Sequence, residues 1–94
     1  MRFQWDPRKE ATNRSKHGIS FDEARSVFFD DEAIVYDDPD HSIGEERLLI
    51  LGMSRVPQLL VVVHCLRGKG DVIRIISARP ATKREIRNYW EQRR

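Results

Sequence analysis

The stretch that decides the fold lies near the C-terminus and reads Val72-Ile73-Arg74-Ile75-Ile76-Ser77-Ala78-Arg79-Pro80-Ala81-Thr82-Lys83-Arg84-Glu85. Four β-branched aliphatic residues in its first half predict a strand. Pro80 ends this strand, because proline has no N–H to donate to a ladder. Thr82 followed three residues later by Glu85 predicts a capping box that begins a helix. Basic side chains therefore gather at one sheet edge, where they suit a polyanion such as RNA.

The length and composition of the chain predict one small domain. Residues 1–94 can support only a thin core, so we expect a single sheet with a few helices. No apolar run has transmembrane length, and the N-terminus lacks the long apolar segment of a signal peptide. Cys65 is the only cysteine, which excludes an internal disulfide and a cysteine-rich zinc site. These features indicate a cytoplasmic protein with no membrane attachment.

Charge is unevenly distributed along the chain. The net charge is +2, but residues 1–18 carry +3, residues 19–46 carry −9 and residues 64–94 carry +6. Two basic ends around an acidic middle form one positive face if the ends meet in space. The alternative is a solvated surface of mixed charge.

Hydrophobic spacing predicts the remaining elements. Apolar alternation and apolar runs indicate strands at 3–5, 33–36, 47–53, 59–66 and from 72 to the proline at 80. Helices are predicted from 7 to 17, from a second capping box at Ser20 and Glu23 to about residue 30, and from 82 onward. The last four strands have hairpin-length connections, which predict an antiparallel meander with the helices packed on it. The fold class is therefore α+β.

The first predicted helix differs from the last one in its surface. Asp6-Pro7 is a strong helix start and Gly18 is a typical stop, but the residues between them are almost all polar. A helix that is polar nearly all round is either weakly held or turned toward a ligand. In the last helix, Ile86, Tyr89 and Trp90 have the spacing of a packing stripe.

Several motifs together resemble one known family. They are Trp5-Asp6 with Lys9 and Asn13, Lys16-His17-Gly18-Ile19-Ser20-Phe21-Asp22-Glu23-Ala24, Glu45-Glu46-Arg47, Leu60-Val61-Val62-Val63-His64, Arg74-Ile75-Ile76-Ser77-Ala78-Arg79 and Glu85. In this order and spacing the chain resembles the BrnT toxins of bacterial type II toxin–antitoxin systems. The resemblance implies a RelE-like fold, a small antiparallel sheet packed with helices. It also implies a ribonuclease that blocks translation, and a BrnA-like antitoxin with a DNA-binding domain that forms a hetero-oligomer with the toxin.

RNA cleavage without a metal needs particular side chains. A base removes the proton of the ribose 2′-hydroxyl, a cation stabilises the charge at phosphorus, and an acid protonates the leaving oxygen. Arg79 is the first candidate for the phosphate, because it ends a strand and its guanidinium fork matches two phosphate oxygens. A salt bridge to an acidic residue of the middle segment is the alternative. Arg47 is the second candidate, although it can instead pair with Glu45 or Glu46.

The candidates for proton transfer are histidines. His64 follows an apolar strand and His17 ends the polar helix, and histidine exchanges protons near neutral pH. A structural histidine in a strand and a helix C-terminal charge are the respective alternatives. We therefore predict Arg79, Arg47, His64 and His17 as catalytic residues. The predicted substrate-binding residues are Lys16, Arg74, Lys83, Arg84 and Tyr89, although the spacing of Tyr89 favours the core and Glu85 is explained by its cap.

No metal or cofactor is expected. Asp37, Asp38, Asp40 and His41 are crowded, but they lack calcium-loop and zinc-motif spacing, so we interpret them as a solvated loop. Two other functions stay open at this stage. One is a non-catalytic module that binds RNA or the ribosome, and the other is an interaction protein whose basic surface grips an acidic antitoxin segment.

Overall fold

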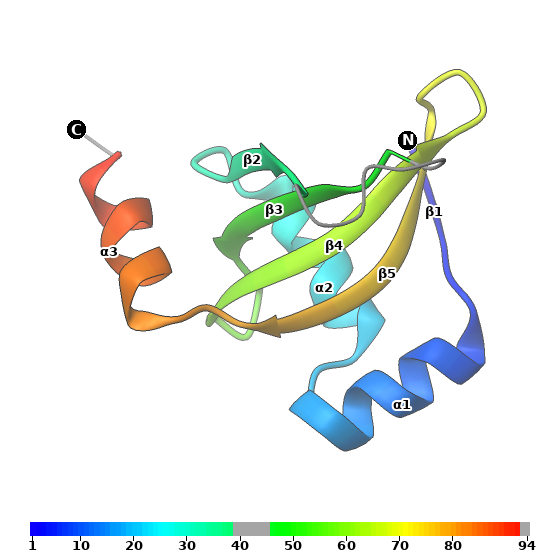
Figure 1. The fold of residues 1–94 in the computed structure, drawn as a ribbon, viewed down its shortest axis with the longest axis horizontal. Coiled ribbons are helices and arrows are strands. Elements are labelled where there is room, and N and C mark those ends of the chain that lie inside the picture. The colour runs from blue at the N-terminus through cyan, green and yellow to red at the C-terminus, as the bar shows by residue number, and fades with distance from the viewer. Residues whose placement is uncertain (39–45, 93–94) are drawn as a thin grey trace.

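The elements follow the predicted order. The structure is a computed structural model that describes residues 1–38 and 46–92 (Figure 1). In chain order the elements are β1 (Arg2–Gln4), α1 (Pro7–His17), α2 (Phe21–Ser26), a 3₁₀ turn η1 (Val27–Phe29), β2 (Ile34–Asp37), β3 (Leu48–Met53), β4 (Leu59–Arg67), β5 (Val72–Pro80) and α3 (Lys83–Glu91). The α+β class is therefore confirmed.

The five strands form one sheet in the order β1-β5-β4-β3-β2. Strands β2 to β5 make the expected antiparallel meander. Strand β1 pairs in parallel with β5, so the sheet is mixed rather than wholly antiparallel. Because α1 and α2 separate β1 from the meander, no hairpin dictates an antiparallel pairing for it.

The helix starts were predicted with one error. Asp6 accepts a hydrogen bond from the Arg8 N–H at 2.8 Å, and Gly18 ends α1 with a φ of 72°. Thr82 and Glu85 form the expected reciprocal capping box of α3. Ser20 also caps α2, but the Glu23 carboxylate does not return to it.

The carboxylate of Glu23 is buried instead. It accepts hydrogen bonds from the Ser54 hydroxyl at 2.7 Å and from the Gln58 amide at 2.8 Å, so it ties α2 to the β3–β4 turn. The predicted second helix is also shorter than expected, since its final part is the 3₁₀ turn η1. The error over Glu23 has a tertiary cause, because its partners Ser54 and Gln58 lie more than 30 residues away in the sequence.

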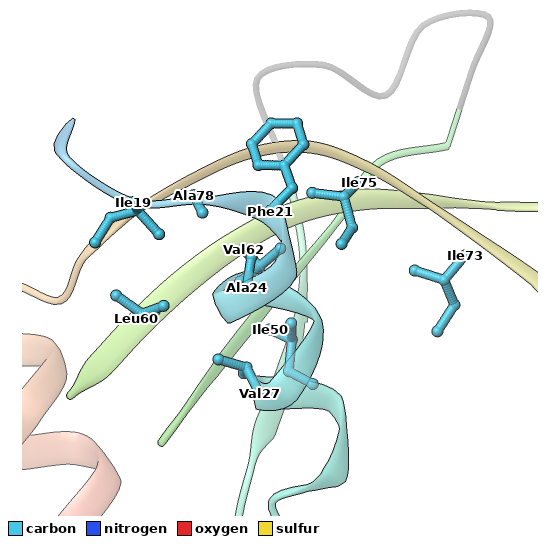
Figure 2. Packing of buried hydrophobic residues seen from close by; sticks show 10 residues of the cluster. All are labelled: Ile19, Phe21, Ala24, Val27, Ile50, Leu60, Val62, Ile73, Ile75 and Ala78. Carbon is cyan, nitrogen blue, oxygen red and sulfur yellow. The ribbon is translucent and has the colours of Figure 1, made fainter. Parts of the chain in front are cut away.

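The main core lies between α2 with η1 and one face of the sheet (Figure 2). Its buried residues are Ile19, Phe21, Ala24, Val27, Ile50, Leu60, Val62, Ile73, Ile75 and Ala78. Phe3 and Trp5 pack against this cluster, as their alternation predicts. Ten buried apolar side chains give this face most of the burial that holds the small domain together.

The opposite face of the sheet is covered mainly at one end, where Tyr89 of α3 packs on Leu51 and Val61. The predicted packing stripe of α3 is wrong in part. Tyr89 is buried, but Ile86 and Trp90 are 37% and 47% exposed. Figure 1 shows α3 at the end of the sheet rather than across it, and Tyr89 is the one buried residue of this helix.

Candidate functional site

Helix α1 lies along the outer edge of β5 (Figure 1). Strand β1 covers this edge only from Val72 to Arg74, and the helix packs beside the rest of β5. A buried asparagine joins the two elements, since the Asn13 side chain accepts a hydrogen bond from the Ala78 N–H at 3.0 Å. The same amide donates to the Ile19 carbonyl at 3.0 Å. Asn13 therefore fixes the helix, the loop after it and the strand relative to one another.

A pocket of about 390 Å³ lies between α1 and β5. Its lining residues are Arg8, Lys9, Thr12, Asn13, Lys16, His17, Ile76 and Ser77. Three of them are cations on one face of α1, and none of these lining residues is acidic. Arg8 lies 3.8 Å from Asp6 and is almost fully exposed, so that contact neutralises little of its charge. The pocket therefore presents a positive wall to solvent.

The polarity of α1 now has a structural reason. The sequence left two possibilities for this polar helix: it is weakly held, or it is turned toward a ligand. The position of α1 beside the pocket fits a helix that is turned toward a ligand. The residues at 8, 9, 12, 13 and 16 follow helical spacing and form one wall of the pocket. Of the predicted site residues, His17 and Lys16 are brought together here.

Arg79 forms a salt bridge, as the alternative interpretation predicted, but its partner is Glu85 and not a residue of the acidic middle segment. Its two terminal nitrogens donate to both carboxylate oxygens of Glu85, at 2.8 and 2.9 Å. The guanidinium hydrogen bonds and charge of Arg79, with hydrogen bonds from Thr82, lower the pKa of Glu85 to about 2. Glu85 is therefore ionised across the physiological range and poorly suited to act as a base. The Arg79 side chain keeps 38% of its surface exposed, so one part of it still faces solvent.

Tyr36 lies near this ion pair and was not among the predicted site residues. Burial, followed by the negative charge of Glu85, raises the pKa of the Tyr36 phenol. Tyr36 packs against the apolar cluster of Leu51, Val61 and Tyr89, on the face of the sheet opposite the main core. Its alternation with Ile34 in a short strand is a signal for that face, but only the structure shows that Glu85 is nearby.

The structure does not bring Arg47 and Arg79 together. Leu48 pairs with His64, and Arg74 pairs with Cys65, so Arg47 and Arg74 lie near the same end of β4. Arg79 lies five residues further along β5, a separation of roughly 15 Å at strand spacing. The predicted convergence of these two arginines in one pocket is therefore absent.

His64 lies in the core, on the face covered by α2 and η1. It is 3% exposed, its Nδ1 lies 3.2 Å from the Val62 carbonyl oxygen, and its ring packs edge-on against Phe28 at 4.8 Å. Burial lowers the pKa of this imidazole. The surroundings fit the structural alternative for His64.

The remaining predicted residues are distributed over α3. Tyr89 is buried, and its hydroxyl donates to Asp30 at 2.7 Å, so it serves the core. Lys83 and Arg84 are exposed in the first turn of α3. Arg8, Lys9, Thr12 and Ser77 line the pocket but were not among the predicted site residues. The i, i+4 spacing along α1 was the available signal for the first three, and Ser77 had none because it lies on β5.

Two further features concern metals and membranes. Within residues 1–38 and 46–92, no group of three or more His, Cys, Asp or Glu side chains could hold a metal ion. Asp40 and His41 of the acidic loop lie outside the described residues. No helix in the described part of the chain is long and apolar enough to span a bilayer.

The fold and the pocket define a small α+β protein with a cationic cavity beside an edge of its sheet. The chain matches, over residues 5–85, the family model of the BrnT ribonuclease toxins of type II toxin–antitoxin systems, and it belongs to that family. It also resembles the crystal structure of the Brucella abortus ribonuclease toxin BrnT. That match has a TM-score of 0.68 and 25% identity over 88% of this chain and 99% of the other. No curated protein matches.

Proposed function

We propose that the protein cleaves RNA without a metal ion and thereby inhibits translation. The observation that carries this proposal is the cationic pocket between α1 and β5, which gathers Lys9, Lys16 and His17 from a single helix. Membership of a ribonuclease toxin family supports RNA as the anion that the pocket receives.

The pocket residues supply what the chemistry requires. His17 takes the proton of the ribose 2′-hydroxyl, whose oxygen attacks the adjacent phosphorus. The bond from phosphorus to the 5′-oxygen then breaks, which leaves a 2′,3′-cyclic phosphate and a 5′-hydroxyl. The proton held by His17 passes to the leaving oxygen, directly or through water. Lys9 and Lys16 stabilise the negative charge that accumulates on the phosphoryl oxygens.

Arg79 supports this site from the neighbouring sheet face. Ser77 lines the pocket, and Arg79 follows two residues later on the same face of β5. Its pairing with Glu85 fixes the guanidinium, and the exposed part contacts a flanking phosphate. Lys83 and Arg84 continue the positive surface along α3, so a strand leaving the pocket passes over them. Arg47 and Arg74 lie further along the sheet and bind a more distant part of the RNA.

Growth and RNA integrity after induced expression test the proposal. The double variant Lys9→Ala/Lys16→Ala should abolish growth arrest and leave cellular RNA intact. Arg14→Ala removes one cation from the same helix outside the pocket, so it should stay toxic. Cleavage by purified protein should persist in excess EDTA. Loss of cleavage in EDTA would refute metal independence, and toxicity of the double variant would refute the pocket.

The family implies an antitoxin, and we propose a BrnA-like one with a DNA-binding domain. It forms a hetero-oligomer with the toxin in the cytoplasm and neutralises it. The test is co-expression of the toxin with the product of the adjacent reading frame. Restored growth and a complex that co-purifies are expected, and labelled amino-acid incorporation should fall only when the toxin is expressed alone.

A second candidate is an RNA- or ribosome-binding module without catalysis. It is favoured by one observation: of the four predicted catalytic residues, only His17 lines the pocket. This function predicts salt-sensitive RNA binding with no cleavage products. Electrophoresis of RNA after prolonged incubation with the purified protein distinguishes the two functions.

A further inference from the structure

We propose that the pocket between α1 and β5 seats one unstacked nucleotide, so that the protein acts on unpaired RNA. This inference rests on the proposed function in one respect, that RNA is the polyanion bound. It goes further by stating which form of RNA enters, and it follows from the lining and the dimensions of the cavity.

The two walls of the pocket differ in chemistry. Helix α1 contributes Arg8, Lys9 and Lys16, which suit a phosphate. Strand β5 contributes Ile76, a half-buried aliphatic side chain that offers an apolar contact to a base. A ligand that matches both walls has an anionic end and a planar, weakly polar end. A nucleotide has both, whereas inorganic phosphate has only the first.

Each wall also carries a hydroxyl group. Thr12 and Ser77 line the pocket, and each hydroxyl can donate and accept a hydrogen bond. The Thr12 hydroxyl donates to the Arg8 carbonyl at 3.1 Å and keeps its capacity to accept. These hydroxyls can form hydrogen bonds with the polar edges of a ribose or a base. An acidic peptide would use the cations of the pocket but would make fewer hydrogen bonds with these hydroxyls.

The size and position of the pocket favour unpaired RNA. A volume of about 390 Å³ lies within the range of small-ligand sites, and it cannot hold a base pair with its two backbones. A duplex would have to flip a nucleotide out, which costs free energy, whereas a nucleotide of a single strand is already accessible. The walls are preformed, because the Asn13 amide holds α1 against β5 on one side of the cavity.

The test compares unpaired and paired RNA of the same sequence. The probe is a fluorescent 12-nucleotide 2′-O-methyl strand, which lacks the attacking hydroxyl, measured by anisotropy alone and annealed to its complement. We expect the unpaired strand to bind at least about tenfold more tightly than the duplex. Lys16→Ala and Ile76→Ala should each weaken binding of the unpaired strand, and Arg14→Ala, outside the pocket, should leave the preference for unpaired RNA unchanged.

Competition identifies what the pocket recognises. A nucleoside monophosphate should displace the strand at a concentration at least about tenfold lower than inorganic phosphate does, since only the nucleotide also uses the β5 wall. Equal displacement by phosphate, or by a poly-glutamate peptide, would overturn the inference.

The two proposals fail in different ways. Equal affinity for duplex and unpaired RNA would overturn the single-nucleotide site while leaving cleavage intact. Tight, selective binding of the unpaired strand without cleavage of unmodified RNA would support the pocket and overturn the ribonuclease proposal. Circular dichroism identifies variants that unfold. In that case, hydrogen exchange of the unmodified protein is the second measurement: a bound mononucleotide should slow exchange of the α1 and β5 amides, and unchanged exchange would overturn the inference.

Discussion

The α1 pocket and the sheet face around Arg79 both carry cations, but they use them differently. In the pocket, Lys9 and Lys16 face a cavity whose described lining is free of carboxylates. On the sheet face, both terminal nitrogens of Arg79 are occupied by Glu85. The two regions are adjacent, because Ser77 and Arg79 lie on one face of β5. A cation in a motif is therefore less available to a ligand when a nearby carboxylate is already paired with it.

The amide that builds the pocket gives the largest expected effect. Asn13→Leu leaves the Ala78 N–H and the Ile19 carbonyl buried without their partners. The free energy of unfolding should fall by about 2–4 kcal/mol, and RNA binding should be lost along with the pocket. Urea denaturation followed by circular dichroism measures the first effect. Thr12→Val at the neighbouring exposed position should cost less than about 1 kcal/mol, and an equal loss there would contradict the role of Asn13.

Removing the two pocket lysines should have the next largest effect. Lys9→Ala/Lys16→Ala should weaken binding of unpaired RNA by about 30- to 100-fold at low salt, because two phosphate contacts are lost. The slope of log affinity against log salt concentration should fall by about 1.4. Arg79→Ala should weaken binding by less than about tenfold, because Glu85 neutralises much of that charge. A larger effect of Arg79→Ala would reverse the comparison.

Removing the charge of Glu85 tests the same difference between the pocket lysines and Arg79, because it leaves Arg79 without its carboxylate partner. Glu85→Gln keeps a side chain that can return to the Thr82 N–H, so the capping box persists. The half-exposed ion pair is lost, which should cost about 0.5–1 kcal/mol of stability. RNA affinity should rise by about three- to tenfold as the guanidinium becomes available. Thr82→Ala is the matched control: it damages the cap, leaves the ion pair and should not raise RNA affinity.

The fold and the site also show which features could be predicted from the sequence and which could not. The order of the elements, two helix starts and one helix end could be predicted, because Pro7, the Thr82–Glu85 pair and Gly18 act locally. The Glu23 carboxylate was wrongly assigned to a cap, since Ser54 and Gln58 come from a distant turn. The same reason applies to the site. Lys16 and His17 were found because they adjoin Gly18, whereas Lys9 and Ser77 meet only after α1 packs along β5.

The pairing of Arg79 shows a second limit. The capping box was a sufficient explanation for Glu85 in the sequence. The sequence pattern does not indicate that the same carboxylate accepts hydrogen bonds from both the Thr82 N–H and the Arg79 guanidinium. The separation of Arg47 from Arg79 depends on the register of β3, β4 and β5, which a sequence does not state. Local signals were thus reliable for elements, and contacts between elements determined which side chains share a site.

Acid titration of stability separates the ion pair from the pocket in a different way. The pKa of Glu85 is lowered from 4.5 to about 2 in the folded protein, so the unfolded state binds a proton first as pH falls. The contribution of the ion pair is therefore present above pH 4.5 and is lost between about pH 4.5 and 2. Unfolding curves of the wild type and of Glu85→Gln should converge over that window. Curves that stay parallel would mean that the carboxylate contributes no net stability.

The two histidines separate a role in the core from a role in the pocket. Burial lowers the pKa of His64 below its ordinary value of 6.5, so an unfolded chain takes up that proton before the folded protein does. Stability should fall as pH drops below about 6.5, by at most about 1.4 kcal/mol per pH unit. His64→Gln should flatten this slope and keep the RNA affinity of the pocket, because residue 64 lies in the core beside Phe28. His17→Gln should instead lower cleavage by about 10²- to 10⁴-fold, because His17 lines the pocket. Cleavage lost in His64→Gln but kept in His17→Gln, measured in folded variants, would exchange the roles assigned to the core and the pocket.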